Sequence, residues 1–409
     1  MHAGAFVFRL FFIALACVLL LPASYGAEAP DDLPYPQGKA FPVMIYGVPG
    51  DDIPAVSRDG YNLFQAYTRP PRTAAKPWAD VTAVQAWLKR VRQHKRYASV
   101  PLSEEDLSAN WEEADIIAQM EKLSPDPTIA WWYLPEEMTW TDDAKFGRLK
   151  TVSGWARKHD PQRRPTFEYL AGNYIAYDLR NYVPYVDVIG IGSYIDYNEQ
   201  PRQWVRWAVR QTIQGIEEAG YTVGPDYLGR QRVPAATLQL FVEGGTHRAN
   251  GPETYHDVWN AVCAGAKAIV VFSWNHRNEL PAEVTQAYAK AAKQLTQQPG
   301  LGKAILFGEQ IATVTADVTE GPKATPPFDA WGGKGITFPT VNLLCIRDEG
   351  NTFIIAVNDS DKPIKVTFRG VPGNAGRIDV IDEKRSLESS DGGFSDVFAP
   401  WGVHLYQLR

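Results

Sequence analysis

The chain has few cysteines and lacks the residue clusters that bind metals or phosphates. Three cysteines occur in 409 residues, and Cys17 lies in an apolar N-terminal run. Cys263 and Cys345 are far apart in the sequence, and a disulfide between them stays open. No group of Cys and His residues has the spacing of a zinc site, and no glycine-rich loop resembles a phosphate-binding turn. We therefore expect no metal ion and no organic cofactor.

An excess of positive charge is also absent. The chain has 41 Lys and Arg residues against 47 Asp and Glu residues, which gives a net charge of −6. Nucleic-acid-binding proteins usually carry a basic surface, so we expect no nucleic acid partner. Aromatic residues, by contrast, make up 12% of the chain. Aromatic rings stack on the C–H faces of sugars, so this excess is compatible with carbohydrate binding, although a large core would also explain most of it.

The apolar run near the N-terminus is too short to span a membrane. Leu10–Leu21 is about 12 residues long, whereas a spanning helix needs about 20. It follows Arg9 and precedes small residues that allow cleavage near Gly26. Residues 1–27 therefore have the pattern of a secretory signal peptide, with a retained membrane anchor as the alternative. We expect an exported protein, periplasmic or extracellular, with no membrane contact after cleavage.

Eight segments have the pattern of buried strands, and helical segments separate most of them. The predicted strands are Phe41–Val48, Gly60–Tyr67, Arg96–Leu102, Thr128–Leu134, Arg164–Tyr169, Tyr185–Tyr194, Ala236–Gly245 and Ala266–Trp274. The predicted helices are Val81–His94, Trp111–Leu123, Asp142–His159, Pro201–Ala219, Thr254–Gly265 and Pro281–Gln297. Eight such units in about 260 residues favour an α/β fold, a parallel (β/α)8 TIM barrel. An open doubly wound sheet is the alternative, but its glycine-rich first turn is missing.

The last hundred or so residues have a different pattern, with short strands between turn residues and no predicted helix. The predicted strands are Gln310–Ala316, Val341–Arg347, Thr352–Asn358, Ile364–Arg369, Arg377–Ile381 and Gly402–Leu408. This pattern favours a C-terminal antiparallel β-sandwich. We therefore predict a barrel domain over residues 38–298 and a sandwich domain over residues 304–409.

Acidic residues follow two of the predicted barrel strands. Glu136 and Glu137 come just after the fourth strand, and Glu243 ends the seventh strand before two glycines. Active sites of such barrels lie at the carboxyl ends of the strands, so we expect these carboxylates to share one pocket. A protonated and a charged carboxyl group facing each other can cleave a glycosidic bond. Solvated strand-end carboxylates, or acids that begin the next helix, are the alternative interpretation.

Residues Trp132–Glu137 read Trp-Tyr-Leu-Pro-Glu-Glu. This resembles the strand-four motif of the clan A glycoside hydrolases, retaining (β/α)8 enzymes in which a Trp and a few apolar residues precede Asn-Glu. The resemblance implies that Glu137 is the acid/base residue and that Glu136 replaces the Asn, unless the register differs by one residue. Glu243 matches the nucleophile, which ends strand seven in the clan. The resemblance covers roughly residues 41–297.

Further positions match the clan at strands six and eight. Tyr194 matches a Tyr that typically hydrogen-bonds the nucleophile. Ser273-Trp274 resembles a Ser/Trp pair, often joined by a cis peptide, whose Trp forms the floor of the sugar site. Each aromatic residue could instead be core packing. The other substrate-binding candidates are the motif's Trp132 and polar residues at the predicted rim: Glu168, Asn275, His276, Asp51, Asp52, Gln65 and Tyr67.

The resemblance implies a retaining glycoside hydrolase that acts on a β-linked polysaccharide or oligosaccharide, and thus a carbohydrate substrate. Two alternatives stay open. One is a non-catalytic carbohydrate-binding protein on a hydrolase-like barrel. The other is an inverting hydrolase, in which the two carboxyl groups lie farther apart. The fold cannot decide among them, because this barrel supports many chemistries. The sequence does not indicate an oligomeric state.

Overall fold

The structure is a computed structural model that describes residues 30–65, 81–102, 113–372 and 376–408. The predicted signal peptide (1–27) and Tyr67 lie outside these residues. None of the described helices is long and apolar enough to cross a membrane.

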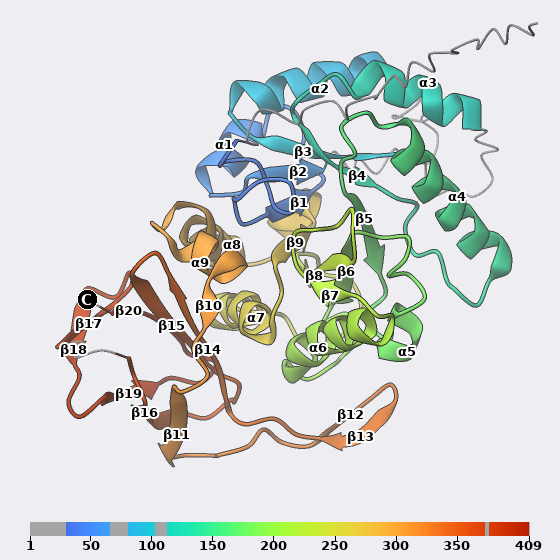
Figure 1. The fold of residues 1–409 in the computed structure, drawn as a ribbon. Helices are drawn as coiled ribbons and strands as arrows, with labels where there is room; N and C mark the ends of the chain where they lie inside the picture. The colour runs from blue at the N-terminus through green and yellow to red at the C-terminus, as the bar shows by residue number, and fades with distance from the viewer. Residues whose placement is uncertain (1–29, 66–80, 103–112, 373–375, 409) are drawn as a thin grey trace, which may run out of the picture.

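Eight parallel strands form a closed barrel (Figure 1). They are β1 (Val43–Tyr46), β2 (Leu63–Gln65), β3 (Tyr97–Pro101), β4 (Ile129–Tyr133), β5 (Thr166–Leu170), β6 (Val188–Ser193), β8 (Gln231–Gln239) and β9 (Ala268–Phe272). The barrel closes because β9 pairs with β1 and β6 pairs with β8. The short strand β7 (Thr222–Val223) pairs with the start of β8. The predicted (β/α)8 barrel is confirmed.

Amphipathic helices surround the barrel. They are α1 (Ile53–Arg58), α2 (Val81–Gln93), α3 (Glu113–Leu123), α4 (Asp143–His159), α5 (Ala176–Leu179), α6 (Gln203–Glu218), α7 (Gly251–Ala264), η1 (Trp274–Glu279), α8 (Ala282–Gln297) and α9 (Leu301–Phe307). In α2, for example, Val84, Leu88 and Val91 are buried on one face. The prediction missed four of these helices, α1, α5, η1 and α9, each too short to show a clear helical period.

The seventh barrel strand is shifted from its predicted position. The prediction was Ala236–Gly245, whereas β8 spans Gln231–Gln239. The side chain of Gln239 donates to the carbonyl of Phe241 at 3.0 Å, and its oxygen accepts from a backbone N–H of the loop after β6 at 3.0 Å. These bonds turn the chain out of the strand. Glu243 therefore lies in the following loop and is exposed, so its predicted place at a buried strand end is wrong.

Large aromatic side chains fill the upper part of the barrel. Tyr46 and Tyr133 face each other with ring centroids 5.8 Å apart, and Tyr133 stacks on Phe167 at 5.3 Å. Gly192 of β6 makes room for Tyr169, because a Cβ there would lie 2.5 Å from the Tyr169 hydroxyl. The barrel interior is therefore a packed core, as this fold requires.

Trp132 lies outside the barrel wall, where it takes part in a buried polar cluster. Its Nε1–H donates to Asp160 Oδ2 at 2.8 Å, and the Arg164 guanidinium covers its ring at 5.5 Å. Asp160 and Arg164 also form a fully buried ion pair at 2.9 Å. Trp132 is therefore a structural residue, and its predicted role in substrate binding is wrong.

The Asp160→Ala variant should lose about 3–5 kcal/mol of unfolding free energy, because it leaves the buried charge of Arg164 without its partner. Urea unfolding followed by circular dichroism measures this loss. The matched control is Lys303→Ala, which breaks an exposed ion pair with Glu349 and should leave the midpoint almost unchanged. Equal small shifts in the two variants would contradict the structural role of the buried pair.

Glu168 also faces away from the barrel interior. Side chains alternate along a strand, and its neighbours Phe167 and Tyr169 point inward. Burial raises the pKa of the Glu168 carboxyl well above its ordinary value, the charge of Glu136 adds to this, and the backbone of Met138 partly offsets it. Since Glu168 is fully buried outside the barrel interior, it does not lie at the substrate-binding rim where it was predicted, and its environment favours the neutral carboxyl group.

The Glu168→Gln variant should be more stable than the wild type at neutral pH. The folded pKa lies above the unfolded value of about 4.3, so wild-type stability falls as pH rises from there, by at most about 1.4 kcal/mol per pH unit. Gln has the shape of the protonated carboxyl group and cannot ionise. Urea unfolding from pH 4 to pH 8 should give Glu168→Gln and the wild type equal unfolding free energies at pH 4. The variant's excess in unfolding free energy should then grow as the pH rises. Glu349→Gln is the control, and a constant gap for Glu168→Gln would refute this account.

The C-terminal domain is a β-sandwich. Its strands are β10 (Glu309–Gln310), β11 (Thr315–Glu320), β12 (Phe328–Ala330), β13 (Gly333–Ile336), β14 (Val341–Asp348), β15 (Asn351–Asn358), β16 (Ile364–Arg369), β17 (Arg377–Val380), β18 (Arg385–Glu388), β19 (Gly393–Phe398) and β20 (Val403–Leu408). A six-stranded sheet (β10-β14-β15-β20-β17-β18) and a three-stranded sheet (β11-β16-β19) enclose its core. The predicted sandwich is confirmed, but the strand predicted at Gln310–Ala316 is divided between β10 and β11.

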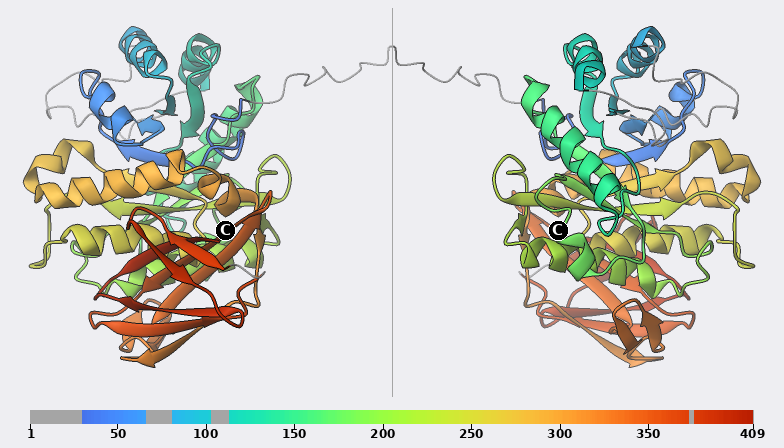
Figure 2. Two further views of the ribbon diagram at one scale, coloured as in Figure 1. Left: turned by 90° about the vertical axis from the view of Figure 1, so that its left-hand side faces the viewer. Right: turned by 90° about the vertical axis from the view of Figure 1, so that its right-hand side faces the viewer.

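The sandwich packs directly against the barrel beside α7 (Figure 2). Along β15, Ile354 and Ala356 enter the sandwich core, while Phe353, Ile355 and Val357 join the barrel core. Cys263 of α7 lies 3.7 Å from a carbonyl of β15. Cys263 and Cys345 are both buried and free, so they form no disulfide.

Candidate active site

A cleft of about 700 Å³ opens at the carboxyl ends of the barrel strands. Residues after β4, β5, β6, β8 and β9 line it, and the C-terminal domain adds one residue. The lining residues are Glu136, Glu137, Met138, Lys145, Tyr169, Ala171, Gly172, Asn173, Tyr194, Tyr197, Asn198, Gln200, Trp204, Phe241, Glu243, Phe272, His276 and Trp331. The three acidic side chains predicted to act together therefore do share one cleft.

The strand-four carboxylates lie in the loop that follows β4. Glu136 is half-buried and Glu137 is exposed. Glu137 has a left-handed backbone (φ 52°), and its N–H donates to the carbonyl of Tyr169 at 3.4 Å. A non-glycine residue in this conformation costs roughly 1 kcal/mol or more and persists only where its surroundings fix it. Such positions are frequent at functional sites, so the strained turn agrees with a functional role for the Glu pair.

Tyrosine side chains surround Glu136. Burial raises the pKa of Tyr133 well above its ordinary value, and the charge of Glu136 adds to the shift. Burial, Tyr169 and Glu136 together do the same to the pKa of Tyr194. Tyr169 and Tyr194 stack with ring centroids 5.6 Å apart. The charge of Glu136 thus acts on tyrosines at or just after β4, β5 and β6, and Glu136 lines the cleft together with Tyr169 and Tyr194.

Tyr194 lines the cleft as predicted, but its partner differs from the expected one. Its hydroxyl interacts with that of Tyr169, and its ring packs edge-on against Phe241 at 5.0 Å. Within the described part of the chain, no hydrogen bond joins Tyr194 to Glu243. The predicted hydrogen bond to the nucleophile is therefore not formed in this conformation.

Two glycines bring the loop after β8 close to the loop after β6. Gly244 and Gly245 have φ values of 71° and 46°. A Cβ on Gly244 would lie 2.7 Å from the Tyr197 ring, and one on Gly245 would lie 1.9 Å from the carbonyl oxygen of Asp196. Larger residues would force the loops apart. The glycines thus hold Glu243 at the edge of the cleft, beside Tyr197.

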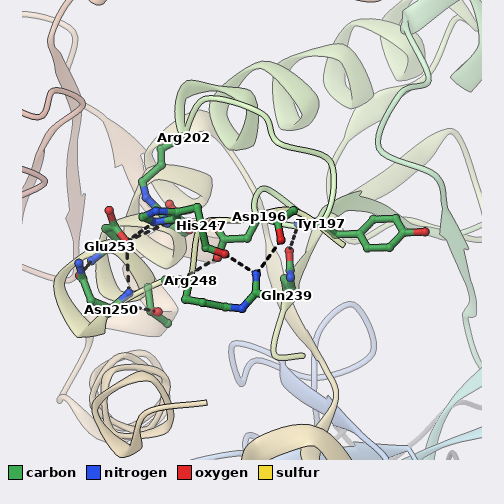
Figure 3. Close-up of polar contacts among 12 residues, drawn as sticks. Asp196, Tyr197, Arg202, Gln239, His247, Arg248, Asn250 and Glu253 are labelled. Atoms are coloured by element: carbon green, nitrogen blue, oxygen red, sulfur yellow. Dashed lines mark hydrogen bonds and ion pairs between the residues drawn. The ribbon is translucent and has the colours of Figure 1, made fainter. Parts of the chain in front are cut away.

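A buried ionic cluster fixes the same two loops (Figure 3). Arg202, just before α6, donates to Asp196 at 3.4 Å, to Glu253 at 3.0 Å and to Asp257. His247 joins the cluster through Glu253 at 2.9 Å. The cluster therefore links the loop after β6, the loop after β8 and the start of α7, and it positions the cleft wall that carries Glu243.

Trp274 is not the floor of the cleft. Its Nε1–H donates to Asp52 Oδ2 at 2.7 Å, and the guanidinium of Arg277 covers its ring at 4.3 Å. Phe272 lines the cleft instead, and the cis peptide bond joins Phe272 to Ser273, one residue earlier than the resemblance implied. Trp274 and Asp52 bind each other outside the cleft lining, so their predicted substrate contacts stay predictions.

The remaining candidates divide between the cleft and the surrounding structure. His276 lines the cleft, and its Nδ1 lies 2.9 Å from Glu279. Asn275 is exposed beside it, outside the cleft lining. Asp51 pairs with Arg90 at the surface, and Gln65 is fully buried. The predicted rim roles of Asn275, Asp51 and Gln65 are therefore not supported.

Several cleft residues gave no signal in the sequence. Asn173, Asn198, Gln200 and Trp204 lie in or near connecting loops, and loop conformation is not readable from residue pattern. Phe272 could have been found, because alternation along β9 points it inward beside Tyr46. Within the described residues, no three His, Cys, Asp or Glu side chains converge as a metal site requires.

A scan of protein-family models and a search of curated proteins return no match to this sequence. Solved structures, however, share the fold. An alpha-amylase from Geobacillus thermoleovorans, complexed with acarbose, aligns with a TM-score of 0.53 at 8% identity, over 88% of this chain and 91% of its own. A GH30 endoxylanase from Clostridium papyrosolvens C71 aligns with a TM-score of 0.51 at 11% identity, over 91% and 96%. A protein described as a glycoside hydrolase aligns with a TM-score of 0.54 at 9% identity, over 90% and 92%. The chain therefore has the fold that the resemblance to clan A implied, through both of its domains.

Proposed function

We propose that this protein is a glycoside hydrolase. The observation that carries the proposal is the cleft itself, in which Glu136, Glu137 and Glu243 meet among aromatic side chains at the carboxyl end of a (β/α)8 barrel. Glycosidic bonds are cleaved by paired carboxyl groups in such a setting. The fold of an alpha-amylase and an endoxylanase supports the same class of reaction.

Glu136 is the proton donor in this proposal. It is half-buried in the cleft, where it acts on Tyr133 and Tyr194, whereas Glu137 and Glu243 are exposed. Its proton passes to the oxygen of the leaving sugar as the glycosidic bond breaks. Glu137, on the exposed side of the strained turn, binds sugar hydroxyl groups. This assignment shifts the strand-four register by one residue from the match with Asn-Glu.

Glu243 is the nucleophile. It is exposed in the cleft, and among the described residues no hydrogen bond or ion pair engages it. One carboxylate oxygen bonds to the anomeric carbon as the leaving group departs with the electron pair. Water, deprotonated by Glu136, then hydrolyses this ester, and the anomeric configuration is retained. The aromatic faces of Phe272 and Phe241 bind the sugar ring beside these groups.

The proposed substrate is a β-linked oligosaccharide or polysaccharide, and the proposed location is outside the cytoplasm. The clan A resemblance supports the β-linkage, and the pattern of residues 1–27 supports export. The carboxyl chemistry requires no metal ion or organic cofactor.

A carbohydrate-binding protein without catalysis is the second candidate, and one observation favours it. The end of the seventh barrel strand carries Gln239, whose side-chain amide is already engaged in structural hydrogen bonds. Glu243 lies four residues beyond it in the loop. A protein of this kind would keep the aromatic cleft and bind glycans without cleaving them.

The experiment is a screen of soluble xylan, mixed-linkage β-glucan, mannan and starch, followed by kinetics of single variants. Glu136→Gln and Glu243→Gln should each lower kcat by about 10³-fold or more, because each removes a group that reacts in the transition state. Glu137→Gln should lose about tenfold, as for one lost hydrogen bond to the substrate. Azide should restore activity to Glu243→Ala with inverted product configuration, which proton NMR detects.

The matched control is Glu349→Gln, an exposed Glu in the C-terminal domain, which should have wild-type kinetics. Glycan binding without cleavage by the wild type would establish the second candidate instead. Cleavage that survives both Glu136→Gln and Glu243→Gln would refute the assigned roles.

A further inference from the structure

A β-hairpin of the C-terminal domain reaches across to the barrel. Strands β12 and β13 form this hairpin, and Figure 1 shows it extending from the sandwich past α6 towards α5. Phe328 at its base belongs to the barrel core, and the ring of Phe338 packs against it at 6.1 Å. Arg206 of α6 covers Phe338 at 4.6 Å and donates to the carbonyl of Pro339 at 3.0 Å. The hairpin is therefore fixed to the barrel at its base.

Trp331 stands at the tip of this hairpin. Its side chain is 63% exposed, more than any other large hydrophobic residue in the described part of the chain. Gly332 completes the turn with φ 80° and lies so close to Ile175 that a Cβ there would be 3.1 Å from its side chain. The backbone of the tip thus approaches the barrel while the indole ring stays in solvent, so packing does not explain the Trp.

Two hollows meet at Trp331. On one side it lines the cleft that contains the carboxylates, together with Tyr197, which is 46% exposed. On the other side it lines a shallower hollow of about 390 Å³, together with Tyr177, which is 51% exposed. Exposed aromatic residues that line two adjoining hollows form a path on which flat apolar faces can stack, with Arg180 lying 4.1 Å from the Tyr177 ring at its far end.

Charge and polarity along the path indicate which ligand fits. The cleft carries Glu136, Glu137 and Glu243 against one lysine, Lys145, so a polyanionic chain would be repelled. The shallower hollow adds the polar side chains Gln211, Gln214 and Glu218 among apolar ones such as Ile175 and Ile336. Amide groups donate and accept hydrogen bonds, as sugar hydroxyl groups require.

We propose that Trp331 is the stacking platform of a distal sugar-binding subsite, and that the substrate is an uncharged glycan chain running from the carboxylates past Trp331 towards Tyr177. This inference rests on the proposed function and deepens it. The C-terminal domain supplies part of the substrate site, and Trp331 selects for chain length. Sugars far from the cleaved bond gain binding free energy on the indole ring, which short substrates cannot reach.

The test compares Trp331→Ala, Trp331→Tyr and the control Leu228→Ala on neutral oligosaccharides of two to eight sugars, prepared from the polysaccharide that the wild type degrades or retains. Leu228 is 58% exposed and lines neither hollow. In the wild type, kcat/KM for the longest oligosaccharide is divided by kcat/KM for the shortest. Trp331→Ala should lower this ratio about tenfold, as for loss of one aromatic contact. Most of the change should be an increase in KM for the longest oligosaccharide. Trp331→Tyr should recover most of this ratio, and Leu228→Ala should keep it.

A ratio in Trp331→Ala equal to that of the wild type would overturn the subsite while leaving the hydrolase intact. If the wild type cleaves nothing, calorimetric binding of the eight-sugar chain decides the inference separately. Weaker binding by Trp331→Ala than by Leu228→Ala then supports the subsite although the proposed catalysis has failed. Equal binding by the two variants overturns it.

Discussion

Closure of the barrel is the constraint on which the rest of the structure depends. The pairing of β9 with β1 and of β6 with β8 leaves no free edge among the eight strands and directs all their carboxyl ends to one rim. Glu136 follows β4 and Glu243 follows β8, yet both reach one cleft because their strands end at this rim. The cleft is thus a consequence of hydrogen bonding between strands that are distant in the sequence.

Local patterns in the sequence were sufficient to predict this framework. Seven of the eight barrel strands lie within their predicted ranges to about one residue, since buried parallel strands are apolar runs of limited length. Helix α7 was predicted to begin at Thr254, three residues late, although its cap by Asn250 and its end at Gly265 are local features. Glu136 and Glu137 were found because the position of the preceding strand fixes where the residues directly after it lie.

Predictions were wrong where a long-range contact decides the local structure. β8 ends early because Gln239 bonds to the loop after β6, a partner far away in the sequence. Trp274, which follows β9, turns away from the cleft because Asp52, which follows β1, accepts its indole N–H. Trp331 could not be predicted as a cleft residue at all, because its position depends on how the C-terminal domain packs against α6.

Different contacts hold the walls of the cleft. The tyrosines around Glu136 are buried in the barrel mouth, whereas Glu243 stands on a loop that two glycines and the Arg202 cluster hold in place. Both walls that carry the carboxylates are therefore held by packing or ionic contacts. The hairpin of the C-terminal domain adds a third wall through Trp331.

The most direct test of the central claim, that this cleft cleaves glycosides through Glu136 and Glu243, is covalent trapping. The protein is incubated with a panel of 2-deoxy-2-fluoro glycosides carrying a good leaving group, and the labelled peptide is identified by mass spectrometry. The account predicts one ester-linked sugar on the peptide that contains Glu243, formed by the wild type and absent from Glu243→Gln. A label on a different carboxylate, or stoichiometric glycan binding with no label from any member of the panel, would contradict it.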